Sequence, residues 1–360
     1  MHTPLQVTPP HSFRSNPTPP PTGKKPRAIT DITDIIKVIK RRQSGHCRIT
    51  DPWARYPLSE GQYADLLQRV QSDDEVLWDY MNKKLRYDYI PVVKQLVFRM
   101  PTHLHEWVMN SVVEELRHQL RKLGAGHGAS ADFARAVNAR GSPTLDFTKT
   151  GYGKHDPDAQ FRHSKAQYPG VVIEVSYAQK RKDLGYLAED YILGSDGNIR
   201  VVIGLDVEYN NSKKATLSVW RPGVVQNEAG EPELVARQTI TNQIIRDDGG
   251  SPRKNDEVGL RLQLRDFATE ALTGPDGLFT DPIYIPASTL CFYVEQAEQD
   301  MAMVKQNQGA VMETNRWVGK RRRQRTPPEE LDDDREAKFQ KIEDKVMAQA
   351  EENDSSYEAD

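Results

Sequence analysis

Two runs of consecutive apolar residues, Val171–Val175 and Val201–Leu205, constrain the fold more than any other feature of the chain. Only Glu174 interrupts them. Such runs are typical of central strands covered on both faces, so we expect the two strands to lie side by side and parallel. Asp183–Leu193 has the apolar spacing of a helix and supplies the crossover between them. A longer helix is predicted at 102–123, and this order of elements indicates an α/β fold with a mixed central sheet flanked by helices.

The composition of the two ends separates them from a globular core of about 200 to 240 residues. Residues 1–28 are rich in Pro, Thr and Ser and are predicted to be a disordered tail. Residues 29–84 are predicted to form an N-terminal helical segment, and residues 85–300 the α/β domain. A linker with a basic cluster is expected at 301–328, followed by an acidic, marginally helical tail at 329–360.

The net charge of −3 is unevenly distributed along the chain. Residues 1–45 carry +6 and residues 329–360 carry −9, which leaves the middle close to neutral. Lys320–Arg325 is the densest basic run. It fits an address for a nuclear import receptor, a phosphate-binding patch or a solvated boundary segment. We expect the first of these, and therefore a nuclear protein.

Cysteine content and hydropathy indicate an intracellular protein. Cys47 and Cys291 are too few and too far apart for a disulfide framework or a cysteine-based zinc site. No stretch approaches about eighteen consecutive apolar residues, and the N-terminus lacks the apolar segment of a signal peptide. We therefore expect no membrane partner.

Two carboxylates, Asp158 and Glu174, form the candidate site. Asp158 follows Pro157 and opens a strand candidate, whereas Glu174 lies within the first apolar run. Because side chains alternate along a strand, Glu174 and Ser176 share one face. A carboxylate beside an apolar run is costly unless a cation meets it. The pair therefore predicts a divalent-metal site with carboxyl groups roughly 4 to 6 Å apart.

At these residues the chain resembles the restriction-endonuclease-like, PD-(D/E)XK superfamily. It is similar in particular to an endonuclease-like family abundant in cyanobacteria, with the pattern PD, then E-V-x-S ending an apolar strand, then D-x3-K-x3-Y. The matching residues are Pro157, Asp158, Glu174, Val175, Asp183 and Tyr191, and Ser176 stands one residue earlier than the Ser of the pattern. Uncharacterised fungal proteins with R-M-P-x3-H-E are also similar, at Arg99-Met100-Pro101 and His105-Glu106. The resemblance covers 104–222; Ser176 replaces the motif Lys, and Leu187 replaces the Lys of the helix.

The resemblance implies a restriction-endonuclease-like fold and metal-dependent hydrolysis of phosphodiester bonds in DNA. Mg²⁺ or Mn²⁺ would be held by Asp158, Glu174 and the carbonyl of Val175, with Glu106 completing the metal shell. Glu115 is the rival of Glu106 because it falls at the edge of the apolar stripe of the first helix.

The sequence does not identify the residue that would activate the attacking water. Ser176 cannot carry positive charge, so Lys180 or Lys182 would have to reach back, or Gln179 would position the water without charge. Loss of a cation there costs about 10² to 10⁴ in rate.

Three functions therefore remain to be separated. The chain is a slow nuclease, a degenerate nuclease that binds nucleic acid without cutting it, or a nuclear interaction protein whose two acids are merely surface or salt-bridged groups. The near-neutral core favours the last, because a protein that binds duplex DNA usually has a basic face.

Further predictions rest on local pattern alone. Residues 134–139 are a strand candidate, residues 222–251 have loop composition, and the final helix of the domain is expected within 283–298. Asp206 and Glu208 alternate on the second central strand and are expected to be exposed.

Overall fold

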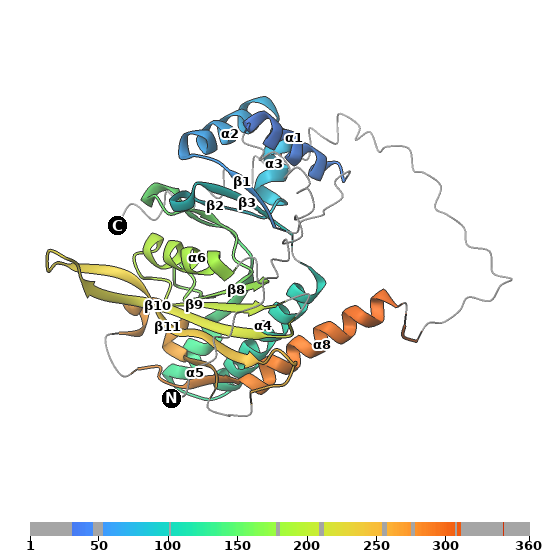
Figure 1. Cartoon of the computed structure of the whole chain (residues 1–360). Helices are drawn as coiled ribbons and strands as arrows, with labels where there is room; N and C mark the ends of the chain where they lie inside the picture. The colour runs from blue at the N-terminus through green and yellow to red at the C-terminus, as the bar shows by residue number, and fades with distance from the viewer. Residues whose placement is uncertain are drawn as a thin grey trace, which may run out of the picture. The chain divides into compact units, whose positions relative to one another are not determined.

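The computed structural model describes residues 31–45, 53–100, 102–177, 181–208, 212–253, 258–274, 278–306 and 308–310, together with Lys341. The chain divides into a compact unit at 1–308 and a second unit at 309–360. The helices and strands named here all belong to the first unit, and Figure 1 shows them arranged as layers.

A six-stranded sheet with the order β11-β10-β9-β8-β7-β4 lies at the centre of the first unit. β8 (Val171–Tyr177) and β9 (Val201–Val207) are parallel neighbours, and α6 (Arg181–Gly194) joins them, as the two apolar runs predicted. The remaining strands are antiparallel to their neighbours and comprise β4 (Val137–Gly141), β7 (Ala159–His163), β10 (Ala215–Gln226) and β11 (Pro232–Arg246). The predicted mixed α/β sheet is therefore confirmed.

Helices α4 (His103–Gly124) and α8 (Ala287–Lys305) cover one face of this sheet (Figure 1). Thr102 begins α4 by accepting a hydrogen bond from the backbone N–H of His105. The buried side chains of α4 recur about every four residues and pack against Val171, Ile173 and their neighbours. The predicted long helix is thus confirmed, and it is followed by the short α5 (Ala129–Ala136).

α6 and a second, smaller sheet cover the opposite face. Val172 of β8 and Val202 of β9 pack there against Leu184 and Tyr191 of α6. The smaller sheet has the order β1-β3-β2-β6-β5. Its strands are β1 (Trp53–Pro57), β2 (Tyr87–Ile90), β3 (Gln95–Arg99), β5 (Leu145–Phe147) and β6 (Gly153–His155).

Alternation along β3 gives the smaller sheet two different faces. Leu96 and Phe98 pack against an outer layer of three helices, α1 (Ile32–Gln43), α2 (Glu60–Asp73) and α3 (Glu75–Lys83). Val97 instead packs in the same cluster as Val172 of the large sheet. Because side chains two residues apart share a face, Arg99 also points toward the large sheet.

Two of the local predictions are wrong. Residues 222–251 are not a loop, because β10 and β11 form a long antiparallel hairpin there whose side chains are mostly half-buried or exposed. Residues 134–139 divide between the end of α5 and the start of β4, since a run of Ala and Val fits either structure.

The remaining elements complete the unit and are β12 (Gly259–Gln263), β13 (Pro282–Pro286), α7 (Glu270–Thr273) and the 3₁₀ turns Pro91–Val93, Thr148–Thr150 and Leu264–Phe267. Among the described residues, no helix is both long and apolar enough to cross a membrane.

Candidate functional site

The register of the large sheet brings the two predicted acids together. β7 and β8 are antiparallel with Ala159 opposite Ile173, so Asp158, one residue before β7, lies next to Glu174. Asp158 and Glu174 are 2 % and 0 % exposed, and both direct their carboxylates to the face that α6 and the smaller sheet cover. Strand alternation thus places them on one face, as the sequence indicated.

The cation that meets both acids is a side chain of the protein itself, Arg99. Its Nη2 donates to Asp158 Oδ1 at 2.9 Å and to Glu174 Oε2 in a shorter contact. Its Nη1 donates to the backbone carbonyl of Asp156 and lies 3.4 Å from Asp88 Oδ1. Because one nitrogen bonds both carboxylates, the two bonded oxygens are within two hydrogen-bond lengths, at most about 6 Å apart.

The carboxylate oxygens that face away from this nitrogen have partners as well. Asp158 Oδ2 accepts from the backbone N–H of Val175 at 2.7 Å and from Nε2 of His105 at 2.8 Å. Glu174 Oε1 accepts from the hydroxyl of Tyr191 at 2.7 Å. Burial, together with the charge of Glu174, raises the pKa of Tyr191 well above its ordinary value, so this hydroxyl keeps its proton.

A second ion pair continues the cluster behind Arg99. His155 is fully buried, with Nε2 3.0 Å from Asp190 Oδ2 and Nδ1 3.7 Å from Asp88 Oδ1. Burial opposes the protonation of His155, but these two acids outweigh it and raise its pKa to about 10. For Asp88, burial acts to raise the pKa, yet Arg99 and His155 lower it below its ordinary value.

Arg99 stays charged for the same reason. Burial alone would lower its pKa, but Asp158, Asp88 and Glu174 raise it well above the ordinary value. A guanidinium presents several N–H donors in a planar fork that suits two carboxylates at once. The cluster is therefore an interior network in which positive side chains meet the buried acids.

The residues do not fit a divalent ion in this arrangement. The guanidinium of Arg99 lies between Asp158 and Glu174, where an ion shared by the two acids would lie, and each of the four oxygens accepts a hydrogen bond. In the part of the chain that the structure describes, no three His, Cys, Asp or Glu side chains are placed to hold a metal.

Glu106 and Glu115, the two candidates for a third acid, lie in different surroundings. Glu106 Oε1 is 3.5 Å from Nη1 of Arg86, whose Nη2 is 3.7 Å from Asp158 Oδ1, so Glu106 lies at the border of the cluster. Glu115 instead accepts from Gln119 and from Tyr293 of α8, on the other face of the sheet. Glu106 is therefore the one brought toward Asp158.

Ser176, which replaces the motif Lys, is fully buried and donates to Asp206 Oδ1 at 2.7 Å. The expectation that Asp206 is exposed is wrong, because its side chain lies at the covered centre of the sheet opposite Ser176. Gln179 and Lys180 lie outside the described residues. Lys182 is in the first turn of α6, but its side chain is not among those described.

Sequence reasoning did not assign the cation. Arg99 and His105 stood in the resemblance only as motif positions, and Asp88, His155 and Asp190 were not considered. The signal was an arginine at the end of the apolar run Leu96–Phe98, which requires a buried acid as much as Glu174 requires a cation. Lys320–Arg325 and Cys47 also lie outside the described residues.

Comparison with known proteins does not assign the chain to a family. The chain matches no protein-family model, no curated protein and no solved structure.

Proposed function

We propose that the first unit is a restriction-endonuclease-like domain that binds nucleic acid and does not hydrolyse it. The arrangement of the large sheet supports this proposal, because β4, β7 and β8 are antiparallel neighbours and the crossover helix α6 leads to the parallel strand β9. Two strands of the smaller sheet, β5 and β6, lie between β4 and β7 in the chain. Asp158, just before β7, and Glu174, on β8, lie side by side, which agrees with the pairing of acids in the PD-(D/E)XK pattern.

The observation that carries the absence of hydrolysis is the position of Arg99. A buried guanidinium between Asp158 and Glu174 repels a second cation and fills the space that a shared ion would take. Glu174 has no exposed surface, so a phosphate group has no path to it in this arrangement.

The lack of a water-activating cation supports the same proposal. Ser176 is neutral and donates its hydroxyl proton to Asp206, so it holds no positive charge beside Glu174. Two independent features of this site therefore argue against hydrolysis. The guanidinium of Arg99 fills the space of the metal ion, and the hydroxyl of Ser176 stands where the motif has the ammonium group of a lysine.

Metal-dependent hydrolysis of DNA is the second candidate function. The approach of Asp158 and Glu174 on one face favours it, because that is the placement that a shared Mg²⁺ or Mn²⁺ needs. This function requires a state in which the guanidinium of Arg99 has left the space between the two acids.

Nicking of supercoiled plasmid in Mg²⁺ or Mn²⁺ separates the two candidates. We expect the wild-type protein to nick no faster than the variant Asp158→Asn/Glu174→Gln, and to retain nucleic-acid binding in EDTA. Metal-dependent nicking by the wild type that is lost in the double variant would establish the nuclease and end our proposal. Failure to bind any nucleic acid would end both.

A further inference from the structure

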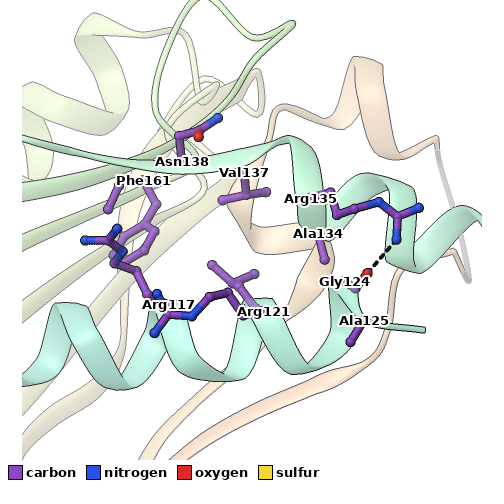
Figure 2. Close-up of a pocket in the computed structure, with 11 residues that line it drawn as sticks. Arg117, Arg121, Gly124, Ala125, Ala134, Arg135, Val137, Asn138 and Phe161 are labelled. Carbon is purple, nitrogen blue, oxygen red and sulfur yellow. Dashed lines mark hydrogen bonds between the residues drawn. The ribbon is translucent and has the colours of Figure 1, made fainter. Parts of the chain in front are cut away.

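A cavity of about 460 Å³ lies between the C-terminal half of α4, α5 and the edge strand β4, on the face of the large sheet that α4 covers. Figure 2 shows the side chains that line it. Its floor is apolar and includes the buried side chains of Val137 and Phe161. Its rim carries three arginines, Arg117 and Arg121 from α4 and Arg135 from α5.

The surroundings of the cavity carry a concentration of basic side chains. Residues 117–140 contain five Arg or Lys and one Asp, although the whole chain has a net charge of −3. All five basic side chains are exposed, and the two that do not line the cavity are Lys122 and Arg140.

The nearby acids neutralise only part of this charge. Glu114 is 2.9 Å from Arg117 and 3.8 Å from Arg121, so one carboxylate is shared by two guanidinium groups. Among the described residues, no carboxylate lies within ion-pair distance of Lys122 or Arg140. These are solvent-exposed contacts, which are weak and readily exchanged for a phosphate partner.

Arg135 has a different role from the other two rim arginines. It donates to the carboxylate of Asp132 and to the backbone carbonyl of Gly124, as the dashed line in Figure 2 marks for Gly124, and lies 3.4 Å from the carbonyl of Gly126. A positive group at this place satisfies carbonyls at the C-terminal end of α4 and offsets the negative end of the helix dipole. Arg117 and Arg121, which share the exposed carboxylate of Glu114, are the rim arginines that remain available to a ligand.

We infer that this surface, defined by Arg117, Arg121, Lys122, Arg135 and Arg140, binds the phosphate groups of a nucleic-acid strand. The inference rests on the proposed function and names the place where binding occurs. Exposed arginines suit phosphate oxygens, and the cavity has the volume of a small-ligand site, with an apolar floor for a sugar or base.

The location of the surface agrees with binding that is separate from cleavage. His105 contacts Asp158 from the first turn of α4, whereas Arg121 lies in its last turn, sixteen residues later. At 1.5 Å per residue, the two positions are about 24 Å apart along the helix. A strand bound at the arginines is therefore held away from Asp158 and Glu174.

Binding of fluorescein-labelled single-stranded DNA, duplex DNA and RNA, measured by polarisation over a series of salt concentrations, tests the inference. The variant Arg117→Glu/Arg121→Glu should bind at least about tenfold more weakly, with a salt dependence about two charges smaller. The variant Arg253→Glu/Lys305→Glu is matched in charge and changes two exposed residues outside the surface, so it should stay close to wild type. Circular dichroism of both variants checks that they fold.

Each outcome of this experiment is decisive. If the wild type binds and the two variants bind equally well, the surface is not the binding site, while the proposed function stands. If the wild type binds none of the nucleic acids, the inference and the proposed function both fall. Equal binding of polyglutamate would overturn the assignment of a nucleic-acid ligand.

Discussion

The two ends of α4 hold charged residues in opposite situations. At the N-terminal end, His105 joins a buried cluster in which Arg99 bonds Asp158 and Glu174 with almost no exposure to water. At the C-terminal end, Arg117 and Arg121 are about half exposed and share a single carboxylate. The difference shows how burial decides the role of a charge, because an interior ion must be satisfied within the fold whereas a surface ion remains available to a partner.

The largest expected difference between the two ends is in stability. Arg99→Met should lower the free energy of unfolding by about 3 to 5 kcal/mol, because it leaves buried carboxylates without their cation. Urea unfolding followed by tryptophan fluorescence measures this loss. Arg253→Met, at an exposed position, serves as the control. The variant Arg99→Met/Asp158→Asn/Glu174→Gln should recover much of the loss, and a loss below about 1 kcal/mol in the single variant would contradict the buried network.

A gain of metal binding is the next largest expected effect. In Arg99→Met the two acids face each other without the guanidinium between them, so Mn²⁺ should bind there. At about one hundred times its dissociation constant the ion should stabilise that variant by about 2 to 3 kcal/mol. Thermal unfolding with and without Mn²⁺ measures the gain, which should vanish in Arg99→Met/Glu174→Gln. Equal stabilisation of the wild type would show that Arg99 does not exclude the ion.

The buried cluster should also make the free energy of unfolding depend on pH, which the exposed arginines should not. His155 has a pKa of about 10 in the folded protein against an ordinary 6.5, so the folded state keeps a proton that the unfolded state releases. Its contribution to stability is complete below pH 6.5 and falls steadily as the pH rises toward 10. Urea unfolding from pH 6 to 10 should show this slope reduced in His155→Asn and unchanged in His127→Asn, at an exposed position.

The smallest effect is expected at the exposed end. Arg117→Gln/Arg121→Gln should change the free energy of unfolding by no more than about 0.5 kcal/mol, since exposed ion pairs contribute little. The same urea unfolding measures it. A loss above about 2 kcal/mol would show that these arginines support the fold, and would weaken their assignment to a ligand.

The central part of the fold could be predicted because its signals are local. The runs at 171–175 and 201–205 and the four-residue spacing of α4 each follow from the burial of one element. β11 was missed because it is an edge strand with few buried side chains, so no apolar alternation distinguishes its polar residues from a loop.

The site was predictable only in part for a related reason. The common face of Asp158 and Glu174 follows from alternation within one hairpin. Arg99, by contrast, is 59 residues before Asp158 and lies on the other sheet, and the pairing of two sheets leaves no periodic trace in the sequence. The sequence pattern indicated that Asp158 and Glu174 need a cation. It did not indicate that an arginine of the same chain supplies it.

The separation of Arg99 from its partners has a consequence for how the chain can be divided. Arg99 ends a strand held by β1 and the outer helices, whereas Asp158 and Glu174 belong to the large sheet. The N-terminal layer thus supplies, through Arg99, the positive group between Asp158 and Glu174. A fragment that begins after residue 101 would lose Arg99 and keep both acids. We therefore expect such a fragment to bind divalent cations more tightly than the intact molecule does.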